Sequence, residues 1–171
     1  VPTDYETEGL WPHLSTDLFC VATESMAETL RPRLVPEQRI RITGIPTRED
    51  FRASYDREQT RQRLDLPQDK RIVLALAGAI CPAYVHFRTA LDNLLPYLHT
   101  FGDTLHFVFV AGNDAEYAGH LRRACSDLGI SDCVTVLEYV EGMAGLMAAS
   151  DLVICKSGGL TVTECLCAQV P

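Results

Sequence analysis

The stretch IVLALA at residues 72–77 decides the fold, because it is a short and continuous apolar run. A run of this kind is typical of a strand in a parallel sheet that is covered on both faces. Similar runs follow at 105–111 (LHFVFVA), 134–137 (VTVL) and 152–155 (LVIC). The segments between them predict helices over 82–99, 114–128 and 143–149, with another from about residue 161. This alternation predicts an α/β fold with a doubly wound, Rossmann-like parallel sheet, in which 152–155 lies beside 72–77 and 134–138 forms an edge.

The N-terminal part carries a separate α/β pattern. The stretches 18–23 and 39–43 predict short strands, and Thr23 is placed to cap a helix over 24–34. The sequence Gly44-Ile45-Pro46 breaks this pattern, residues 47–56 are polar, and residues 57–65 predict a charged helix. We therefore expect residues 1–45 to end one domain, 46–56 to form a linker and 57–171 to form a second, incomplete domain. The starting residue Val1 and the apolar stretch before Pro171 lead us to expect a piece of a longer protein.

Composition excludes several classes of protein. Fifteen basic and 23 acidic residues give a net charge of −8, which argues against general electrostatic binding of nucleic acid. The apolar content of 47% excludes wholesale disorder. The longest nearly apolar run, residues 72–81, is too short to span a bilayer, and we expect no signal peptide. The seven cysteines and five histidines show no CxxC or zinc-finger spacing, so we expect no metal site and plain buried thiols in a cytoplasmic protein.

Ligands of a doubly wound sheet bind beyond the carboxyl ends of its strands, and four loops lie there. Gly78, Asn113 and Val140 follow the first three strands. Gly78 also fits an ordinary tight turn, and Asn113 with Asp114 also fits a turn that caps the next helix.

The fourth loop, KSGGLTVTE at 156–164, places two glycines before a helix N-terminus. Free N–H groups and the helix dipole favour a diphosphate at such a place. The alternative is structural, because Thr161 and Glu164 have the spacing of a capping box, which needs no ligand.

Several stretches in one order carry a family resemblance. They are Thr3-Asp4-Tyr5 with Trp11, residues 17–23 (DLFCVAT), residues 42–46 (ITGIP) with Phe51, Ala111-Gly112-Asn113 and, above all, residues 143–164 (MAGLMAASDLVICKSGGLTVTE). With these stretches the chain resembles glycosyltransferases of family 28, which have the two-domain GT-B fold. Within that family it is most similar to diacylglycerol glycosyltransferases such as monogalactosyldiacylglycerol synthase.

The resemblance implies a UDP-sugar donor site in residues 57–171 and the end of an acceptor domain in residues 1–45. Glu164 would hold the ribose hydroxyls, Gly158, Gly159, Leu160 and Thr161 would lie along the diphosphate, and the backbone near Val140 would meet the uracil. Gly78, Asn113 and Ser157 complete the expected donor-binding set. The implied reaction is transfer of a hexose to a lipid hydroxyl without a metal or cofactor, with the helix dipole stabilising the departing diphosphate.

The chain departs from the family pattern in two places. Ala79-Ile80-Cys81 stands where the family has a glycine-rich loop, and Glu8 stands where the family has a histidine. A carboxylate can serve as a base, so Glu8 is the candidate catalytic residue.

Three readings of function stay open at this point. They are a lipid glycosyltransferase, a related enzyme such as the peptidoglycan lipid-intermediate N-acetylglucosaminyltransferase, and a nucleotide-binding module without catalysis. For the first reading we expect a UDP-sugar and a lipid as partners, and no nucleic acid. We also expect peripheral contact with the inner face of the cell membrane through the N-terminal domain, and no catalysis by this chain alone.

Overall fold

The structure is a computed structural model that describes residues 3–5, 13, 15–78 and 85–171. It divides into two compact units. The first comprises Val1–Arg48 and Ser157–Glu164, and the second comprises Glu49–Lys156 and Cys165–Pro171. The assignment of residues 1–45, 46–56 and 57–171 to an acceptor domain, a linker and a donor domain stays a prediction.

The N-terminal part of the first unit contains a small parallel sheet and the α-helix that connects its strands. Strand β1 (Phe19–Val21) pairs in parallel with β2 (Ile40–Ile42), and α1 (Glu24–Leu30) connects them. The Thr23 hydroxyl accepts a hydrogen bond from the N–H of Met26, so the predicted helix cap is confirmed. The α-helix ends at Leu30, earlier than predicted, and a 3-10 helix (Arg31–Arg33) that contains a proline follows it.

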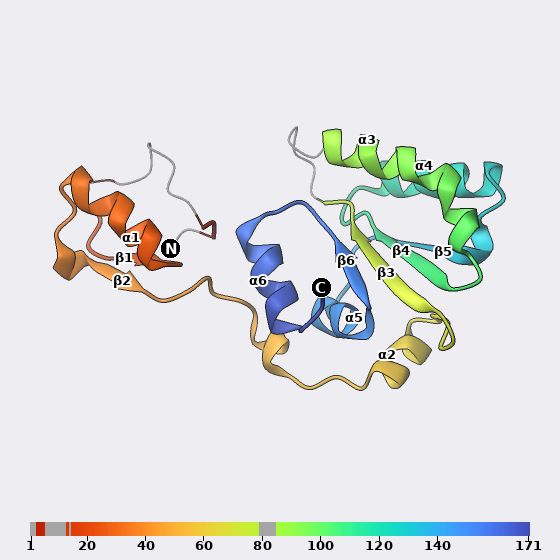
Figure 1. The fold of residues 1–171 in the computed structure, drawn as a ribbon, viewed down its shortest axis with the longest axis horizontal. Helices are drawn as coiled ribbons and strands as arrows, with labels where there is room; N and C mark the ends of the chain where they lie inside the picture. Colours follow the sequence, from red (N-terminus) through yellow and green to blue (C-terminus); the bar gives the residue numbers. More distant parts are fainter. Residues whose placement is uncertain (1–2, 6–12, 14, 79–84) are drawn as a thin grey trace. The chain divides into compact units, whose positions relative to one another are not determined.

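The second unit is built on a four-stranded parallel sheet (Figure 1). Its strands are β3 (Arg71–Leu76), β4 (Leu105–Val110), β5 (Val134–Leu137) and β6 (Leu152–Ile154). The order across the sheet is β5-β4-β3-β6, and all three pairings are parallel. The prediction that 152–155 lies beside 72–77, with 134–138 at an edge, is confirmed.

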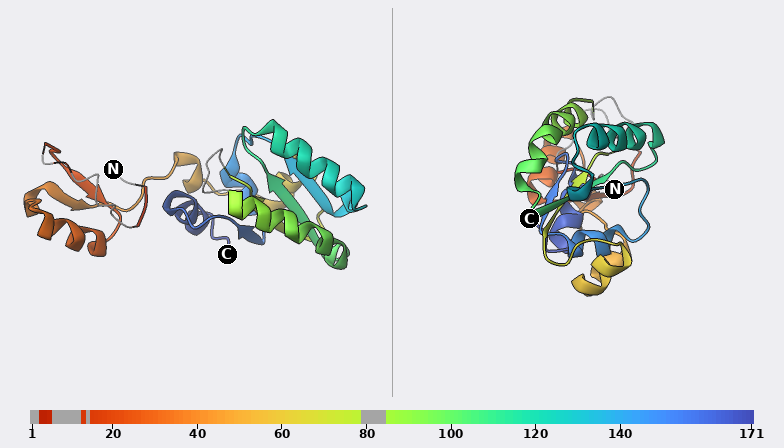
Figure 2. Two further views of the ribbon diagram at one scale, coloured as in Figure 1. Left: turned by 90° about the horizontal axis from the view of Figure 1, so that it is seen from above. Right: turned by 90° about the vertical axis from the view of Figure 1, so that its right-hand side faces the viewer.

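Helices cover both faces of this sheet, so the doubly wound fold class is confirmed. Helices α3 (Val85–Leu94) and α4 (Ala115–Asp127) lie side by side on one face (Figures 1 and 2). Helix α5 (Met143–Ala149) packs on the other face, and α2 (Arg57–Arg63) packs against α5. Within β3, Val73 and Ala75 belong to the core under α3 and α4, whereas Ile72 and Leu74 belong to the opposite core. This burial on both faces explains why the strand is a continuous apolar run.

Further helix boundaries differ from the sequence prediction. The helix expected over 82–99 ends as an α-helix at Leu94, and a 3-10 helix (Leu95–Phe101) with Pro96 in its first turn follows it. Proline lacks the N–H that would continue the α-helical hydrogen bonds, which accounts for the earlier end. The last helix, α6 (Gly159–Cys167), begins two residues before the predicted start at residue 161.

The cysteines differ in their burial. Cys125 and Cys133 are buried, Cys20, Cys155 and Cys165 are half-buried, and Cys167 is exposed. All six are free thiols, while Cys81 lies outside the described residues. The expectation of plain buried thiols is therefore wrong for Cys167, which follows Cys165 by two residues on α6 and has its side chain in solvent.

Candidate functional site

The carboxyl ends of the four parallel strands lie at one edge of the sheet, where ligands of this fold class bind. Three residues predicted from the sequence lie two or three positions after these ends. Gly78 comes after β3, Asn113 after β4 and Val140 after β5. The structure therefore brings these three residues to the same edge, and their part in binding stays a prediction.

The turns after β3 and β4 touch each other. The ladder continues one residue past each strand, because the Ala77 N–H donates to the Val110 carbonyl at 2.9 Å and the Ala111 N–H donates to the Leu137 carbonyl at 2.9 Å. The next residues, Gly78 and Gly112, have φ values of +85° and +66°. Only glycine adopts such angles without strain, and a Cβ on Gly112 would lie 3.4 Å from the Gly78 carbonyl oxygen. The two backbones therefore meet with no side chain between them.

A charged pair fixes these turns to the helices above them. The Asp114 carboxylate accepts the Tyr117 N–H at 3.0 Å and so caps α4, as the sequence predicts. Its second oxygen accepts Arg88 Nη1 at 2.7 Å. The N–H of Tyr117 and the Arg88 guanidinium lower the pKa of Asp114. The sequence did not point to Arg88, because the pair joins positions 26 residues apart.

The loop after β5 leads into α5. It contains Glu138, which accepts a hydrogen bond from Arg122 of α4 at 2.9 Å, and the half-buried Val140. It ends at Gly142, which precedes α5 with a φ of +79°. The predicted contact of the Val140 backbone with uracil stays a prediction.

The segment after β6 refutes the capping-box interpretation. The Val162 N–H donates to the Gly158 carbonyl at 3.0 Å, so helical bonding begins at Gly158. Thr161 is consequently the third residue of α6 and not its cap, and Glu164 lies in the helix interior. The expected structural role of Glu164 as a capping-box partner is therefore wrong. Its predicted role toward a ribose is not affected by this correction.

The first turn of α6 contacts the N-terminal segment inside the first unit. The hydroxyl groups of Tyr5 and Thr163 are 2.7 Å apart, and Thr163 donates to the Gly159 carbonyl at 2.7 Å. A side chain on Gly159 would collide with the backbone of Thr3 and Asp4. Gly159 is thus required here for close packing, whether or not it also lies along a diphosphate. Ser157 and Leu160 are exposed in this segment, and Gly158 is half-buried.

Two sequence-based predictions fall on residues that the structure does not describe. Glu8, the candidate base, and the loop Ala79-Ile80-Cys81 lie outside the described residues. Among the residues that are described, no group of three or more His, Cys, Asp or Glu side chains is placed to hold a metal ion. None of the described helices is long and apolar enough to cross a membrane.

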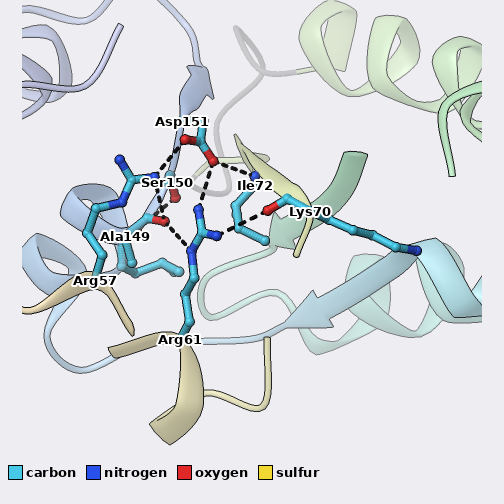
Figure 3. Close-up of polar contacts among 8 residues, drawn as sticks. Arg57, Arg61, Lys70, Ile72, Ala149, Ser150 and Asp151 are labelled. Atoms are coloured by element: carbon cyan, nitrogen blue, oxygen red, sulfur yellow. Dashed lines mark hydrogen bonds and ion pairs between the residues drawn. The ribbon is translucent and has the colours of Figure 1, made fainter. Parts of the chain in front are cut away.

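The opposite edge of the sheet carries a second charged cluster (Figure 3). Asp151, just before β6, accepts Arg57 Nη2 at 2.7 Å, Arg61 Nη2 at 2.8 Å and the Ile72 N–H at 2.8 Å. Arg61 also donates to the Ala149 carbonyl at 3.0 Å, at the C-terminus of α5. Burial alone would raise the pKa of Asp151, but these donors together lower it by a larger amount, so the pKa lies below its ordinary value.

A polar pocket of about 1160 Å³ adjoins this charged cluster, and Arg57, Arg61, Gln68, Arg71 and Asp103 are among the residues that line it. It lies at the amino ends of the strands, away from the edge at which ligands of doubly wound sheets bind. Its acidic and basic side chains balance each other, and Arg61 and Asp151 already satisfy one another. We therefore place the candidate site at the carboxyl edge, not in this pocket.

Solved structures with a similar fold are glycosyltransferases. The chain aligns with WaaG, a glycosyltransferase involved in lipopolysaccharide biosynthesis, with a TM-score of 0.60 and 18% identity, covering 94% of this chain and 44% of that one. It aligns with Anabaena HepE in complex with UDP and glucose with a TM-score of 0.58 and 16% identity, covering 91% of this chain and 43% of HepE. These likenesses confirm the GT-B type of fold.

Curated relatives match the whole chain. The processive diacylglycerol beta-glucosyltransferase of Bacillus subtilis (strain 168) is 29% identical over 171 residues, which cover 100% of this chain and 43% of the relative. The protein of the same name from Bacillus cereus (strain B4264) is 30% identical over 173 residues and is covered to 42%. The chain thus spans less than half the length of the curated relatives it matches. Residues 88–171 also match the model of the glycosyltransferase family 28 C-terminal domain.

Proposed function

We propose that the protein transfers a hexose from a UDP-sugar to a lipid acceptor such as diacylglycerol. The observation that carries this proposal is the match of the entire chain to processive diacylglycerol beta-glucosyltransferases at 29–30% identity. The match of residues 88–171 to the glycosyltransferase family 28 C-terminal domain supports it, and so do the fold neighbours solved with UDP and with UDP-glucose.

The donor would bind at the carboxyl edge of the four-stranded sheet. Gly78 and Asn113 are proposed to face the donor, and the backbone near Val140 is proposed to pair with the uracil. The touching turns at Gly78 and Gly112 support this, because they present backbone without side chains at the strand ends.

The segment 157–164 is proposed to hold the diphosphate and the ribose. Ser157, Gly158, Gly159, Leu160 and Thr161 include the first turn of α6, whose N-terminal N–H groups have no partner within the helix. These groups and the helix dipole favour an anion and would stabilise the diphosphate as it departs. Glu164 would accept hydrogen bonds from the ribose hydroxyls.

The acceptor side rests on the N-terminal part of the protein. Glu8 is proposed as the base that removes the proton from the acceptor hydroxyl, since a carboxylate in that position can do so. A lipid acceptor implies that the protein works at the inner face of the cell membrane, bound peripherally through its N-terminal domain.

Turnover by the full-length protein tests this proposal. Vesicles that contain diacylglycerol are incubated with radiolabelled UDP-glucose, UDP-galactose or UDP-N-acetylglucosamine, and the lipid fraction is separated by thin-layer chromatography. We expect label in a hexosyl-diacylglycerol band that disappears when diacylglycerol is omitted. Label only in a polyprenyl lipid supplied with UDP-N-acetylglucosamine would replace diacylglycerol by the peptidoglycan-type acceptor. Binding of UDP without any transfer would reduce the protein to a nucleotide-binding module.

A further inference from the structure

The turns that carry Gly78 and Asn113 are joined by one arginine of α3. Arg88 Nε donates to the Ala77 carbonyl at 3.1 Å, directly before Gly78, and Nη1 donates to Asp114 at 2.7 Å, directly after Asn113. The guanidinium thus spans the ends of β3 and β4 at the edge where we place the donor. Its side chain is 18% exposed and that of Asp114 is 16% exposed, so water competes little for either group.

The guanidinium is also held from the side of α4. Its carbon atom lies 4.2 Å from the centroid of the Tyr117 ring, within the range of a cation–π contact. The Tyr117 hydroxyl donates to Asp92 of α3 at 3.1 Å, one helical turn after Arg88. Arg88 therefore has a fixed position relative to both helices and both turns.

One nitrogen atom of Arg88 is placed in a way that does not stabilise the fold. Its Nη2 is buried and has no hydrogen-bond partner among the residues that the structure describes. A buried donor without a partner is costly, and such groups in native proteins are expected to have a reason beyond packing.

We propose that Arg88 is a positioning residue for the donor nucleotide. It holds the turn of Gly78 and the turn of Asn113 in fixed positions relative to each other. The proposal rests on the function proposed above. Its physical basis is that donor binding requires backbone groups of two separate loops to be in place before the ligand arrives, and misplacement of such groups weakens binding. Lysine cannot replace arginine here, because a single ammonium group cannot reach the Ala77 carbonyl and Asp114 in the same fork geometry.

The chain offers a matched control at the opposite edge of the same sheet. Arg61 is 9% exposed, pairs with Asp151 at 2.8 Å and donates its Nε to the Ala149 carbonyl at 3.0 Å. It therefore resembles Arg88 in burial, in its ion pair and in its bond to a main-chain carbonyl. It lies at the amino ends of the strands, where it has no part in the proposed donor site.

The test compares Arg88→Lys with Arg61→Lys in the full-length protein by calorimetric titration with UDP, by thermal melts and by hydrogen exchange. We expect both variants to melt at lower temperature. Only Arg88→Lys should weaken UDP binding, by about tenfold, and raise the KM for the UDP-sugar more than it changes kcat. Amide exchange should become faster at residues 77–78 and 111–113 in Arg88→Lys, and at residues 149–151 in Arg61→Lys.

A second variant keeps the test valid if Arg88→Lys does not fold. Asp114→Asn retains a good cap for α4 but removes the charged partner of Arg88, so it should weaken UDP binding in the same direction. Equal UDP affinity in the wild type and in the Arg88 and Asp114 variants, or an equal loss in Arg61→Lys, would overturn the inference. If the wild type itself fails to bind UDP, the proposed function fails and the inference falls with it.

Discussion

Replacing Asp151 by asparagine removes the charge that joins the arginines of α2 to the sheet. Asp151 accepts three hydrogen bonds, from Arg57, Arg61 and the Ile72 N–H (Figure 3). The asparagine keeps the shape and one oxygen, which in the place of Oδ2 can still accept from Arg61 and the Ile72 N–H. The second oxygen becomes an amide NH₂ that faces a guanidinium group.

The expected loss follows from the burial of the partners. Breaking a fully buried ion pair costs about 3–5 kcal/mol, whereas an exposed pair contributes about 0–1 kcal/mol. Arg61 is only 9% exposed, but Asp151 is 31% exposed and Arg57 is 48% exposed, so the effect lies between these limits. We expect Asp151→Asn to lower the free energy of unfolding by about 2–3 kcal/mol, which corresponds to a fall in Tm of roughly 10 °C for a domain of this size.

The assay is urea unfolding at pH 7, with Asp69→Asn as the control. Asp69 is an exposed carboxylate at the same edge of the sheet, and its replacement should change stability by less than about 0.5 kcal/mol. Because the pKa of Asp151 in the folded protein is lowered below its ordinary value of 3.8, its contribution is complete above pH 3.8 and is lost as the pH falls through the folded value. Wild type and Asp151→Asn should therefore converge in stability in strong acid. A loss under 0.5 kcal/mol at pH 7 would refute this account of the charged cluster.

Three further predictions concern the pH, the turns and metals. Burial, and secondarily the charge of Lys70, lower the pKa of His106 in the folded protein. The unfolded chain therefore takes up this proton at a higher pH, so the free energy of unfolding should fall as the pH drops below 6.5. In urea unfolding at a series of pH values, His106→Gln should make this part of the stability profile flatter. Gly112→Ala and Gly129→Ala both force alanine to a φ of +66°, and each should cost about 1–2 kcal/mol in the same assay, but only Gly112→Ala should weaken UDP binding in a titration. Hexose transfer should persist in excess EDTA, and a complete loss that Mg²⁺ restores would contradict the expectation of a reaction without metal.

The sheet could be predicted from the sequence because its strands are buried on both faces. Such strands are short apolar runs, and the helices that connect them make the strands parallel. The pairing of β3 with β6 could therefore be predicted from the sequence. Helix ends were less predictable. Pro96 ended α3 early, and α6 began at Gly159, where only glycine leaves room for the backbone of Thr3.

The charged clusters could not be predicted, because they depend on contacts between distant parts of the chain. Arg61 and Asp151 are 90 residues apart in the sequence, and Arg88 and Asp114 are 26 apart. Neither arginine stands out in the sequence, because each lies in a helix with at least one other charged residue. Asp114 was predictable as a cap because that role is local, whereas its ion pair requires the packing of α3 against α4.

Calorimetric titration of UDP against the full-length protein and its Glu164→Gln variant tests the donor site most directly. Because Glu164 lies in the interior of α6, glutamine keeps the helix, and the two proteins should melt at similar temperatures. Loss of one hydrogen bond to a charged acceptor corresponds to about 1.5–3 kcal/mol, so UDP should bind the variant at least about 10-fold more weakly than it binds the wild type. Equal affinity in the two proteins would contradict a ribose contact by Glu164, and no binding to either would contradict a UDP-sugar site in this protein.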